Sequence, residues 1–204
     1  MYIGPSSRAG AETPLLETAN VKVPQDWSKD GRFLLYFEID PRTGHDLWAL
    51  PMTGPEADRK PFPVVKTSYE EQNGQFSPDG SLLAYETNES GRFEIVVQAF
   101  PEAKGKWQVS TGGGVQPRWR ADGRELFFLA PDGNLMATSV TTTGGTLVKS
   151  APVALFPARV TPVGGGANKQ QYVVSRDGRF LINQSVERSA APIMLILNWK
   201  PPAR

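Results

Sequence analysis

One short pattern occurs four times in the 204 residues and constrains the fold more than any other feature: a bulky apolar residue, two variable positions, then Asp-Gly. Its clearest copy is Phe-Ser-Pro-Asp-Gly at residues 76–80, and weaker copies occupy residues 27–31, 119–123 and 174–178. The four aspartates are 49, 43 and 55 residues apart. Repeats of this period, each followed by a short apolar run, are typical of the four-stranded blade of a β-propeller.

The segments between the copies have the character of short strands joined by tight turns. The 20 Gly and 18 Pro residues lie between apolar runs rather than in one tract,. Runs such as 33–37 and 126–129 are continuously apolar, which predicts sheets that are buried on both faces,. Blades packed face to face have this property, whereas strands of a two-sheet sandwich, the alternative, alternate in polarity. The sequence therefore predicts an all-β fold, a β-propeller of four-stranded antiparallel blades.

The predicted organisation is a single propeller domain over residues 1–204. The blade repeats are expected at residues 21–66, 67–111, 112–157 and 167–204. Within residues 1–20, the segment 12–18 is interpreted as the outer strand of a preceding or closing blade, and residues 193–199 are expected to form the last strand of the fourth blade. Three complete and two partial blades leave two alternatives: a fragment of a larger ring, or a four-bladed ring that the N-terminal segment closes.

We interpret the recurring Asp-Gly pairs as turn residues. An aspartate accepts hydrogen bonds from backbone N–H groups two residues on, and glycine supplies the positive φ of a hairpin turn. This structural role is preferred to a calcium site because the offset from the strands is regular. The predicted turn residues are Asp30, Gly31, Asp79, Gly80, Asp122, Gly123, Asp177 and Gly178. The bulky residues that precede the turns, and the five tryptophans generally, are expected to pack between blades.

Composition argues against several kinds of partner. The formal net charge is +1, with 22 basic and 21 acidic side chains, so no strong field attracts a phosphate backbone and no nucleic acid is expected,. The absence of Cys removes disulfides, thiolate chemistry and Cys-based metal sites,. No apolar run approaches the roughly 18 residues that span a bilayer, so no membrane insertion by this chain is expected. Neither a cofactor nor a metal is predicted.

Catalytic motifs are not recognisable in the sequence. His45 is the single histidine and lies beside Asp46 in a loop at residues 40–46. A solvated loop histidine is preferred to a catalytic one, which needs a nucleophile and an orienting partner that converge on it. No Gly-x-Ser-x-Gly motif is present, and the glycine clusters at 112–114 and 164–166 are not followed by helical patterns that would bind phosphate,. The sequence therefore predicts that the chain is not an enzyme.

In a β-propeller, the residues just before each innermost strand face the mouth of the central channel. Lys22, Glu71, Gln116 and Gln170 precede the aspartate of their turns by eight, eight, six and seven residues. We predict that these four residues line the channel mouth and contact a ligand. The alternative is a polar rim without a binding role.

At the Asp-Gly repeats the chain resembles the WD-repeat-like β-propellers of TolB-type proteins. The segments 88–92, 97–101, 106–114 and 116–120, with the closing Leu-Asn-Trp at 197–199, are similar to the C-terminal propeller of bacterial serine/threonine kinases of the acidobacterial type. The resemblance covers nearly the whole chain and implies rings of about six to eight blades. The sequence departs from the family pattern where Val174 replaces the usual aromatic residue.

The resemblance implies a non-catalytic scaffold that binds an unknown protein or small molecule, as the sensor or interaction region of such a kinase or a TolB-like protein. The chain has no Gly-rich phosphate loop, His-Arg-Asp or Asp-Phe-Gly motif, so kinase activity would lie in an upstream domain,. Two alternatives are the gating propeller of a prolyl-oligopeptidase-like hydrolase and a small enzyme that depends on His45 or Glu71. A periplasmic or extracytoplasmic location is expected for a membrane-anchored kinase or TolB-like protein, and a cytoplasmic one otherwise.

Overall fold

The computed structural model describes residues 1–7, 10–160 and 170–184. All secondary structure in these ranges is β except one 3₁₀ turn, η1 (Glu56–Asp58). The predicted strand at 193–199 and the glycine cluster at 164–166 lie outside the described residues. The predicted all-β class is confirmed.

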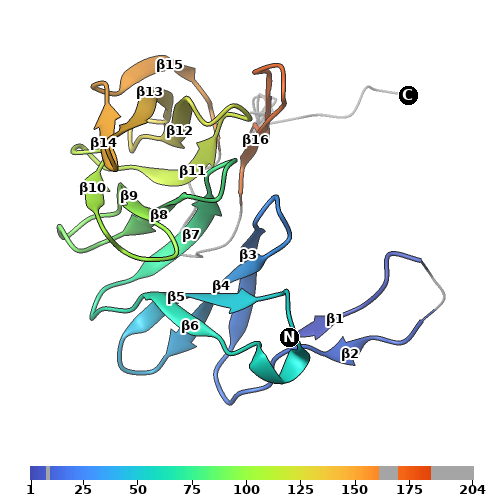
Figure 1. Ribbon diagram of the computed structural model, residues 1–204. Helices are drawn as coiled ribbons and strands as arrows, with labels where there is room; N and C mark the ends of the chain where they lie inside the picture. The colour runs from blue at the N-terminus through green and yellow to red at the C-terminus, as the bar shows by residue number, and fades with distance from the viewer. Residues whose placement is uncertain (8–9, 161–169, 185–204) are drawn as a thin grey trace, which may run out of the picture.

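Three larger antiparallel sheets follow one another along the chain (Figure 1), and in each the innermost strand comes first. The first sheet contains β3 (Lys22–Trp27), β4 (Phe33–Asp40), β5 (Gly44–Pro51) and β6 (Phe62–Val65). The second contains β7 (Glu71–Phe76), β8 (Leu82–Thr87), β9 (Glu94–Ala99) and β10 (Lys106–Gln108). The third contains β11 (Val115–Trp119), β12 (Glu125–Leu129), β13 (Asn134–Thr143), β14 (Thr146–Lys149) and β15 (Val153–Pro157). They lie within the three ranges expected for the first three blades.

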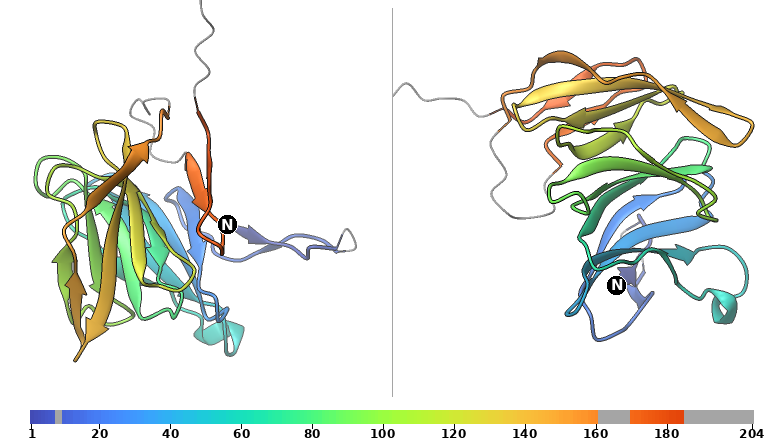
Figure 2. Two further views of the ribbon diagram at one scale, coloured as in Figure 1. Left: turned by 90° about the horizontal axis from the view of Figure 1, so that it is seen from above. Right: turned by 90° about the vertical axis from the view of Figure 1, so that its left-hand side faces the viewer.

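A two-stranded sheet, β16 (Tyr172–Val174) and β17 (Phe180–Ile182), follows the third blade. The innermost strands are neighbours: β3 contacts β7, β7 contacts β11, and β11 contacts β16. Figures 1 and 2 show these four strands gathered about a common axis, with the remaining strands of each sheet further out. This radial arrangement is that of propeller blades.

Apolar side chains fill the space between successive blades. One cluster joins the first and second blades around Leu35, Phe76 and Tyr85, and another joins the second and third around Ala84 and Trp119. Because side chains alternate along a strand, β8 contributes to both clusters and is buried on both faces,. Burial of each large side chain contributes about 1.5–3 kcal/mol. The continuous apolar runs of the sequence follow from this two-sided burial.

The third blade differs from the prediction at its outer side. Strand β13 runs on to Thr143 and turns back into β14 through Gly144 and Gly145, both with positive φ. A Gly-Gly pair favours a two-residue hairpin turn, so this added hairpin has a local cause that the repeat pattern did not indicate. Strand β15 then pairs with β13 as the predicted outer strand.

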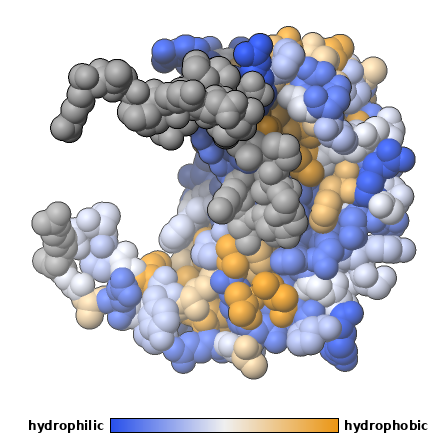
Figure 3. Space-filling model, turned by 180° about the vertical axis from the view of Figure 1, so that it is seen from behind, coloured by the Kyte–Doolittle hydropathy of each residue, from blue (hydrophilic) through white to orange (hydrophobic). Residues whose placement is uncertain are grey.

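The N-terminal segment was predicted incorrectly. Instead of an outer blade strand at 12–18, the structure has β2 (Thr13–Pro14) paired with β1 (Tyr2–Ile3) in a separate two-stranded sheet. This segment lies over the free face of the first blade, where Leu15 and Leu16 pack against Tyr36. Figure 3 shows apolar side chains gathered next to the N-terminal hairpin.

Trp27 also departs from the expectation that the bulky residues are buried. Its side chain is 46% exposed, whereas Phe76 and Trp119 are 5% and 6% exposed. Phe76 and Trp119 are covered by the preceding blade, and the face of β3 that carries Trp27 has no preceding blade in the described part of the chain. The burial of this repeat position therefore depends on the neighbouring blade.

The four Asp-Gly pairs lie in turns at one end of the inner strands. In the clearest copy, Asp79 Oδ1 accepts hydrogen bonds from the Ser77 hydroxyl (2.6 Å) and from Ser81 N (3.1 Å), and Gly80 has a φ of 73°. The other three glycines have φ values of 74°, 74° and 82°. Lys29 in the first turn donates to the carbonyl of Ala121 in the third, 3.4 Å away, so the turns converge.

Candidate binding site at the channel mouth

The end of the inner strands opposite the turns is shaped by β-bulges. Strands β3, β7 and β11 each shift register against their partner at corresponding positions. Asn73 and Gln116, each six residues before the aspartate of its turn, have φ values of 52° and 57°. Positive φ is uncommon for residues other than glycine and often occurs at functional sites. At the next position of β7, Gly74 is required because a Cβ would lie 2.6 Å from Leu35 Cδ2.

Glu86 connects the second and third blades at this end. Its carboxylate is 1% exposed and accepts hydrogen bonds from Gln72 Nε2 (3.1 Å) and Asn73 Nδ2 (2.7 Å). It also accepts the backbone N–H of Gln116 from the third blade. Within the described part of the chain, the hydrogen-bond partners of Glu86 are these three donors, an environment suited to a carboxylate,.

The same network continues to the start of β16. Asn73 Oδ1 accepts a hydrogen bond from Gln170 Nε2 (3.2 Å), and Gln116 Oε1 accepts the backbone N–H of Gln171 (2.8 Å). The hydroxyl of Tyr172 donates to the carbonyl of Gln116 (2.8 Å). Amide side chains from the second, third and fourth blades thus meet at one place, which we call the channel-mouth network: Asn73, Glu86, Gln116, Gln170 and Gln171.

Burial governs the electrostatics of this network. It raises the pKa of Glu86 to about 7, and the hydrogen bonds from Gln116, Asn73 and Gln72 offset part of that rise. The carboxyl therefore exchanges its proton near neutral pH. A change of ionisation there would alter the hydrogen bonds of all three donors.

The structure brings together two of the four predicted channel-mouth residues. Gln116 and Gln170 belong to the network, although Gln116 is only 4% exposed while Gln170 is exposed. Lys22 instead pairs with Glu38 in the first blade, with 3.5 Å between Lys22 Nζ and Glu38 Oε2, and its side chain is 3% exposed. The distance along the sequence is similar for all four residues, but the bulges change the side to which each side chain points.

Glu71 is buried next to the first blade rather than at the mouth. It is 1% exposed and accepts a hydrogen bond from the Thr67 hydroxyl, while its Oε2 has no partner among the described residues. Burial raises the pKa of Glu71 to about 7, with a smaller contribution from the charge of Asp46. Glu71 thus belongs to the interface between the first two blades.

A second set of residues, which sequence reasoning missed, lies four positions before each turn aspartate. Asp26 Oδ2 accepts the backbone N–H of Phe76 (2.9 Å), and Gln75 Oε1 accepts that of Trp119 (2.8 Å). Each side chain reaches from one blade to the inner strand of the next. Asp26, Gln75, Arg118 and Val173 occupy this position in the four copies, so alignment of the repeats on their Asp-Gly pairs could have indicated it.

His45 does not form part of a catalytic arrangement in the described residues. Its Nδ1 and its backbone N–H both bond to Glu70 of the second blade, the latter at 3.0 Å. Burial alone would raise the pKa of Glu70, but the hydrogen bonds from His45 outweigh it and leave the pKa below its usual value. No hydroxyl group in the described ranges bonds to His45. The His45–Glu70 pair connects the first and second blades.

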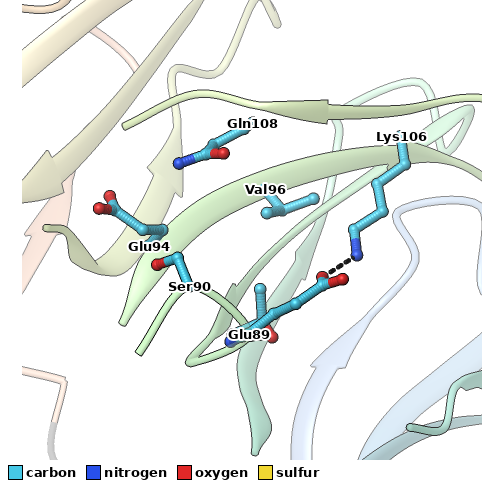
Figure 4. Close-up of a pocket in the computed structure, with 7 residues that line it drawn as sticks. Glu89, Ser90, Glu94, Val96, Lys106 and Gln108 are labelled. Atoms are coloured by element: carbon cyan, nitrogen blue, oxygen red, sulfur yellow. Dashed lines mark hydrogen bonds and ion pairs between the residues drawn. The ribbon is translucent and has the colours of Figure 1, made fainter. Parts of the chain in front are cut away.

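A separate hollow of about 350 Å³ lies on the outer part of the second blade (Figure 4). Its charged groups are already partnered: Glu89 pairs with Lys106, and Glu94 accepts the N–H of Gly113 at 2.9 Å. Figure 4 shows Val96 between these two groups. The hollow therefore offers few unpaired polar atoms to a ligand.

The described residues contain no group of three or more His, Asp or Glu side chains placed to hold a metal ion. They also contain no helix with the length and apolar character of a membrane span.

Comparison with known proteins identifies the fold. No protein-family model matches the chain, and no curated protein matches its sequence. Among solved structures, a puromycin-hydrolyzing peptidase of Mycobacterium tuberculosis aligns with a TM-score of 0.61 and 19% identity over 84% of this chain and 30% of its own. TolB of Acinetobacter baumannii aligns with a TM-score of 0.57 and 14% identity over 84% of this chain and 40% of its own.

A TolB-like protein of Agrobacterium tumefaciens aligns with a TM-score of 0.51 and 15% identity over 67% of this chain and 52% of its own. The chain thus spans between about a third and a half of the length of these three proteins. At such identities the likeness concerns the fold alone. Together with the radial sheets, it shows that this chain has the β-propeller fold found in TolB-like proteins.

Proposed function

We propose that the chain is a non-catalytic propeller that binds a protein or small-molecule ligand at its channel mouth. The observation that carries this proposal is the convergence of amide side chains from three blades, with Gln170 exposed at the surface of the network. Amide groups donate and accept hydrogen bonds without a charge that would require a counter-ion, which suits recognition of a polar ligand. A rigid ring that presents such groups is a common basis for binding.

The sequence resemblance extends this proposal to a biological setting. We infer from it that the propeller is the sensor region of a bacterial serine/threonine kinase or part of a TolB-like protein. The coding sequence upstream of residue 1 tests this inference, because a kinase domain followed by an apolar span would support it. An upstream sequence without kinase motifs would contradict the kinase assignment and leave the binding role in place.

Photo-crosslinking from two ends of the inner strands tests the binding face. A benzoylphenylalanine at Gln170 places the crosslinker at the channel mouth, and one at Lys29 places it at the turn end as a matched control. We expect a discrete crosslinked species in native cells from position 170 and little from position 29. Equal yields of one species from both positions, or a species from position 29 alone, would contradict the proposed face.

The likeness to the mycobacterial peptidase favours one second candidate, a propeller that controls access to a hydrolase. The coding sequence downstream of residue 204 tests this candidate, because a hydrolase domain there would support it. A direct assay tests the remaining alternative, an enzyme in its own right. The purified chain is incubated with puromycin and with aminoacyl p-nitroanilides, and released product is measured. We expect no turnover above the buffer rate. Turnover that is lost in His45→Ala or Glu71→Gln would establish an enzyme in its own right and overturn the scaffold proposal.

A further inference from the structure

The inner strands of the second and third blades have their free edges protected in the same way. Each presents a backbone N–H toward the axis, that of Phe76 and that of Trp119. The preceding blade supplies an oxygen acceptor for each, from Asp26 and Gln75 respectively, at 2.9 and 2.8 Å. Unpaired edge groups are unfavourable when they are shielded from water, so these two side chains complete the junctions.

The fourth inner strand presents the same group. Ser175 N donates to the carbonyl of Arg179 on the β17 side, at 2.8 Å. Successive N–H groups along a strand point to opposite edges, so the N–H of Val174 points away from β17, toward the axis. Ser77 and Phe76 in the second blade show the same relation, with Ser77 N bonded to Leu82 O and Phe76 N bonded across the junction.

Arg118 is at the repeat position that Asp26 and Gln75 occupy in the first two blades. By this equivalence, its side chain lies where an acceptor for the N–H of Val174 is expected. A guanidinium has five donor hydrogens and no acceptor, so it cannot take the role of Asp26 or Gln75. Its Nε is buried and has no hydrogen-bond partner among the described residues. Burial also lowers the pKa of Arg118, although the group stays charged,. Asp26 attracts Arg118 electrostatically, but its two carboxylate oxygens bond to the backbone N–H groups of Trp27 and Phe76, and no ion pair with Arg118 forms among the described residues.

We propose that the junction between the third and fourth blades is a binding site for a carboxylate, which accepts hydrogen bonds from the Arg118 guanidinium and the Val174 backbone N–H. The ligand carboxylate takes the place that a side chain of the protein fills at the two preceding junctions. The carboxylate of Asp26 on the N–H of Phe76 is the equivalent pairing at the junction between the first and second blades. Arginine suits this role because its planar donors match the two oxygens of a carboxylate.

The surroundings favour a carboxylate over a phosphate. Tyr172, which lies near Arg118, is a large aromatic side chain at 2% exposure and suits a planar group. Asp26 contributes negative charge near Arg118. One cation that already has a carboxylate near it is better matched to a monoanion than to a dianion.

This inference rests on the proposed function and specifies its ligand chemistry. The test uses the ¹H–¹⁵N spectrum of the full chain and a matched pair of probes, N-acetylglycine and N-acetylglycinamide, which differ only in the carboxylate. We expect N-acetylglycine to shift the resonances of Arg118 Nε–H and Val174 N–H saturably, and the amide to leave both unchanged. Equal responses to both probes, or no response, would overturn the proposal. A tighter response to inorganic phosphate would overturn the choice of carboxylate.

Substitutions at one strand provide the controls. In Arg118→Gln the new amide oxygen can accept the N–H of Val174, as Gln75 does for Trp119, so the fold should persist while affinity for N-acetylglycine falls about tenfold or more. Arg120→Gln removes an exposed arginine two residues away and should leave the affinity unchanged. A loss of affinity in Arg120→Gln equal to that in Arg118→Gln would contradict the site. Crosslinking from position 170 does not depend on the Arg118 carboxylate site, so failure here and failure of the proposed function can be told apart.

Discussion

The junction between the second and third blades and the junction between the third and fourth are built on the same backbone plan with different side chains. At the first of these, Gln75, Glu86 and Trp119 join the blades through hydrogen bonds and a buried ring. The equivalent positions at the second, counted from the Asp-Gly turns, are Arg118, Leu129 and Val174. One junction is satisfied by internal partners, and the other leaves donors facing the axis. A repeat protein can thus create a specific site by changing a few residues in one copy.

The two junctions also differ in their apolar content. Trp119 lies in a cluster with Ala84, Leu126 and Phe128, and its Nε1 donates to the carbonyl of Gln75 at 3.2 Å. Val174 is only partly buried, although it packs against the cluster that contains Tyr172. The junction that carries the proposed carboxylate site is therefore the less tightly packed one.

The largest contrast is expected for the bulky residue of each junction. Trp119→Ala should lower the free energy of unfolding by about 3–5 kcal/mol, because it removes a buried ring and leaves a cavity. Val174→Ala should lower it by about 1 kcal/mol, since less apolar area is lost. Urea denaturation measures both. Similar losses for the two variants would show that the junctions are equally tight.

The second largest effect is expected for the pH dependence of stability. It arises from Glu86, a carboxyl that the junction between the second and third blades has and the other junction lacks. Glu86 has a pKa of about 7 in the folded protein and 4.5 as its reference value, so the folded state binds more protons between these pH values,. The free energy of unfolding should therefore fall as pH rises from 4.5 to 7, by about 3 kcal/mol for this group. Glu86→Gln should flatten the decline measured by urea titration at several pH values.

Two controls accompany the pH experiment. Glu71 also has a raised pKa, so Glu71→Gln should remove a further part of the same decline. Glu89→Gln, which changes an exposed carboxyl in the same blade, serves as the control substitution. If the free energy of unfolding of Glu86→Gln still falls by the full amount as pH rises, burial does not oppose the charge of Glu86.

A smaller pair of substitutions should have effects of opposite sign. Gln75→Leu leaves the N–H of Trp119 without its acceptor and should cost about 1–3 kcal/mol,. Arg118→Gln supplies an acceptor for the N–H of Val174 and should stabilise the protein by about 0.5–1.5 kcal/mol. Thermal unfolding of the two variants and the unchanged protein measures the difference. A destabilised Arg118→Gln would indicate that Arg118 already has a stabilising partner.

The smallest effects are expected at the turns, which the two junctions share. Asp79→Ala and Asp177→Ala each remove an acceptor for a serine hydroxyl, that of Ser77 and that of Ser175, and should each cost about 1 kcal/mol,. If both variants lose the same free energy of unfolding, the two junctions differ at the channel end of the blades and not at the turns. A loss at one turn several times larger than at the other would move that difference to the turn end.

Much of the fold could be predicted because its causes are local. The Asp-Gly pairs set the turns, and the apolar runs 33–37 and 126–129 predicted strands that are buried on both faces. The N-terminal segment was mispredicted because a two-residue pairing such as Thr13–Pro14 with Tyr2–Ile3 leaves almost no pattern in the sequence. Trp27 was mispredicted because its burial depends on a neighbour that the repeat pattern assumes.

The candidate site was only partly accessible from sequence. Gln116 and Gln170 were selected by their position before the inner strands, but Lys22 and Glu71 were selected by the same argument and point elsewhere. The bulges cause this difference, because one extra residue reverses the side of the strand on which a side chain lies. Glu86, in the middle of a second strand, gave no signal of its own.

The sequence by itself determined the blade as a unit, because turns and two-sided apolar strands depend on residues close together in the chain. Only the tertiary structure decided which polar groups meet, since Gln170 and Asn73 are 97 residues apart and their hydrogen bond requires blades that converge on one axis. The same convergence places β11, the strand that carries Arg118, beside β16. A repeat pattern specifies what each blade is, and the packing of successive blades specifies what lies between them.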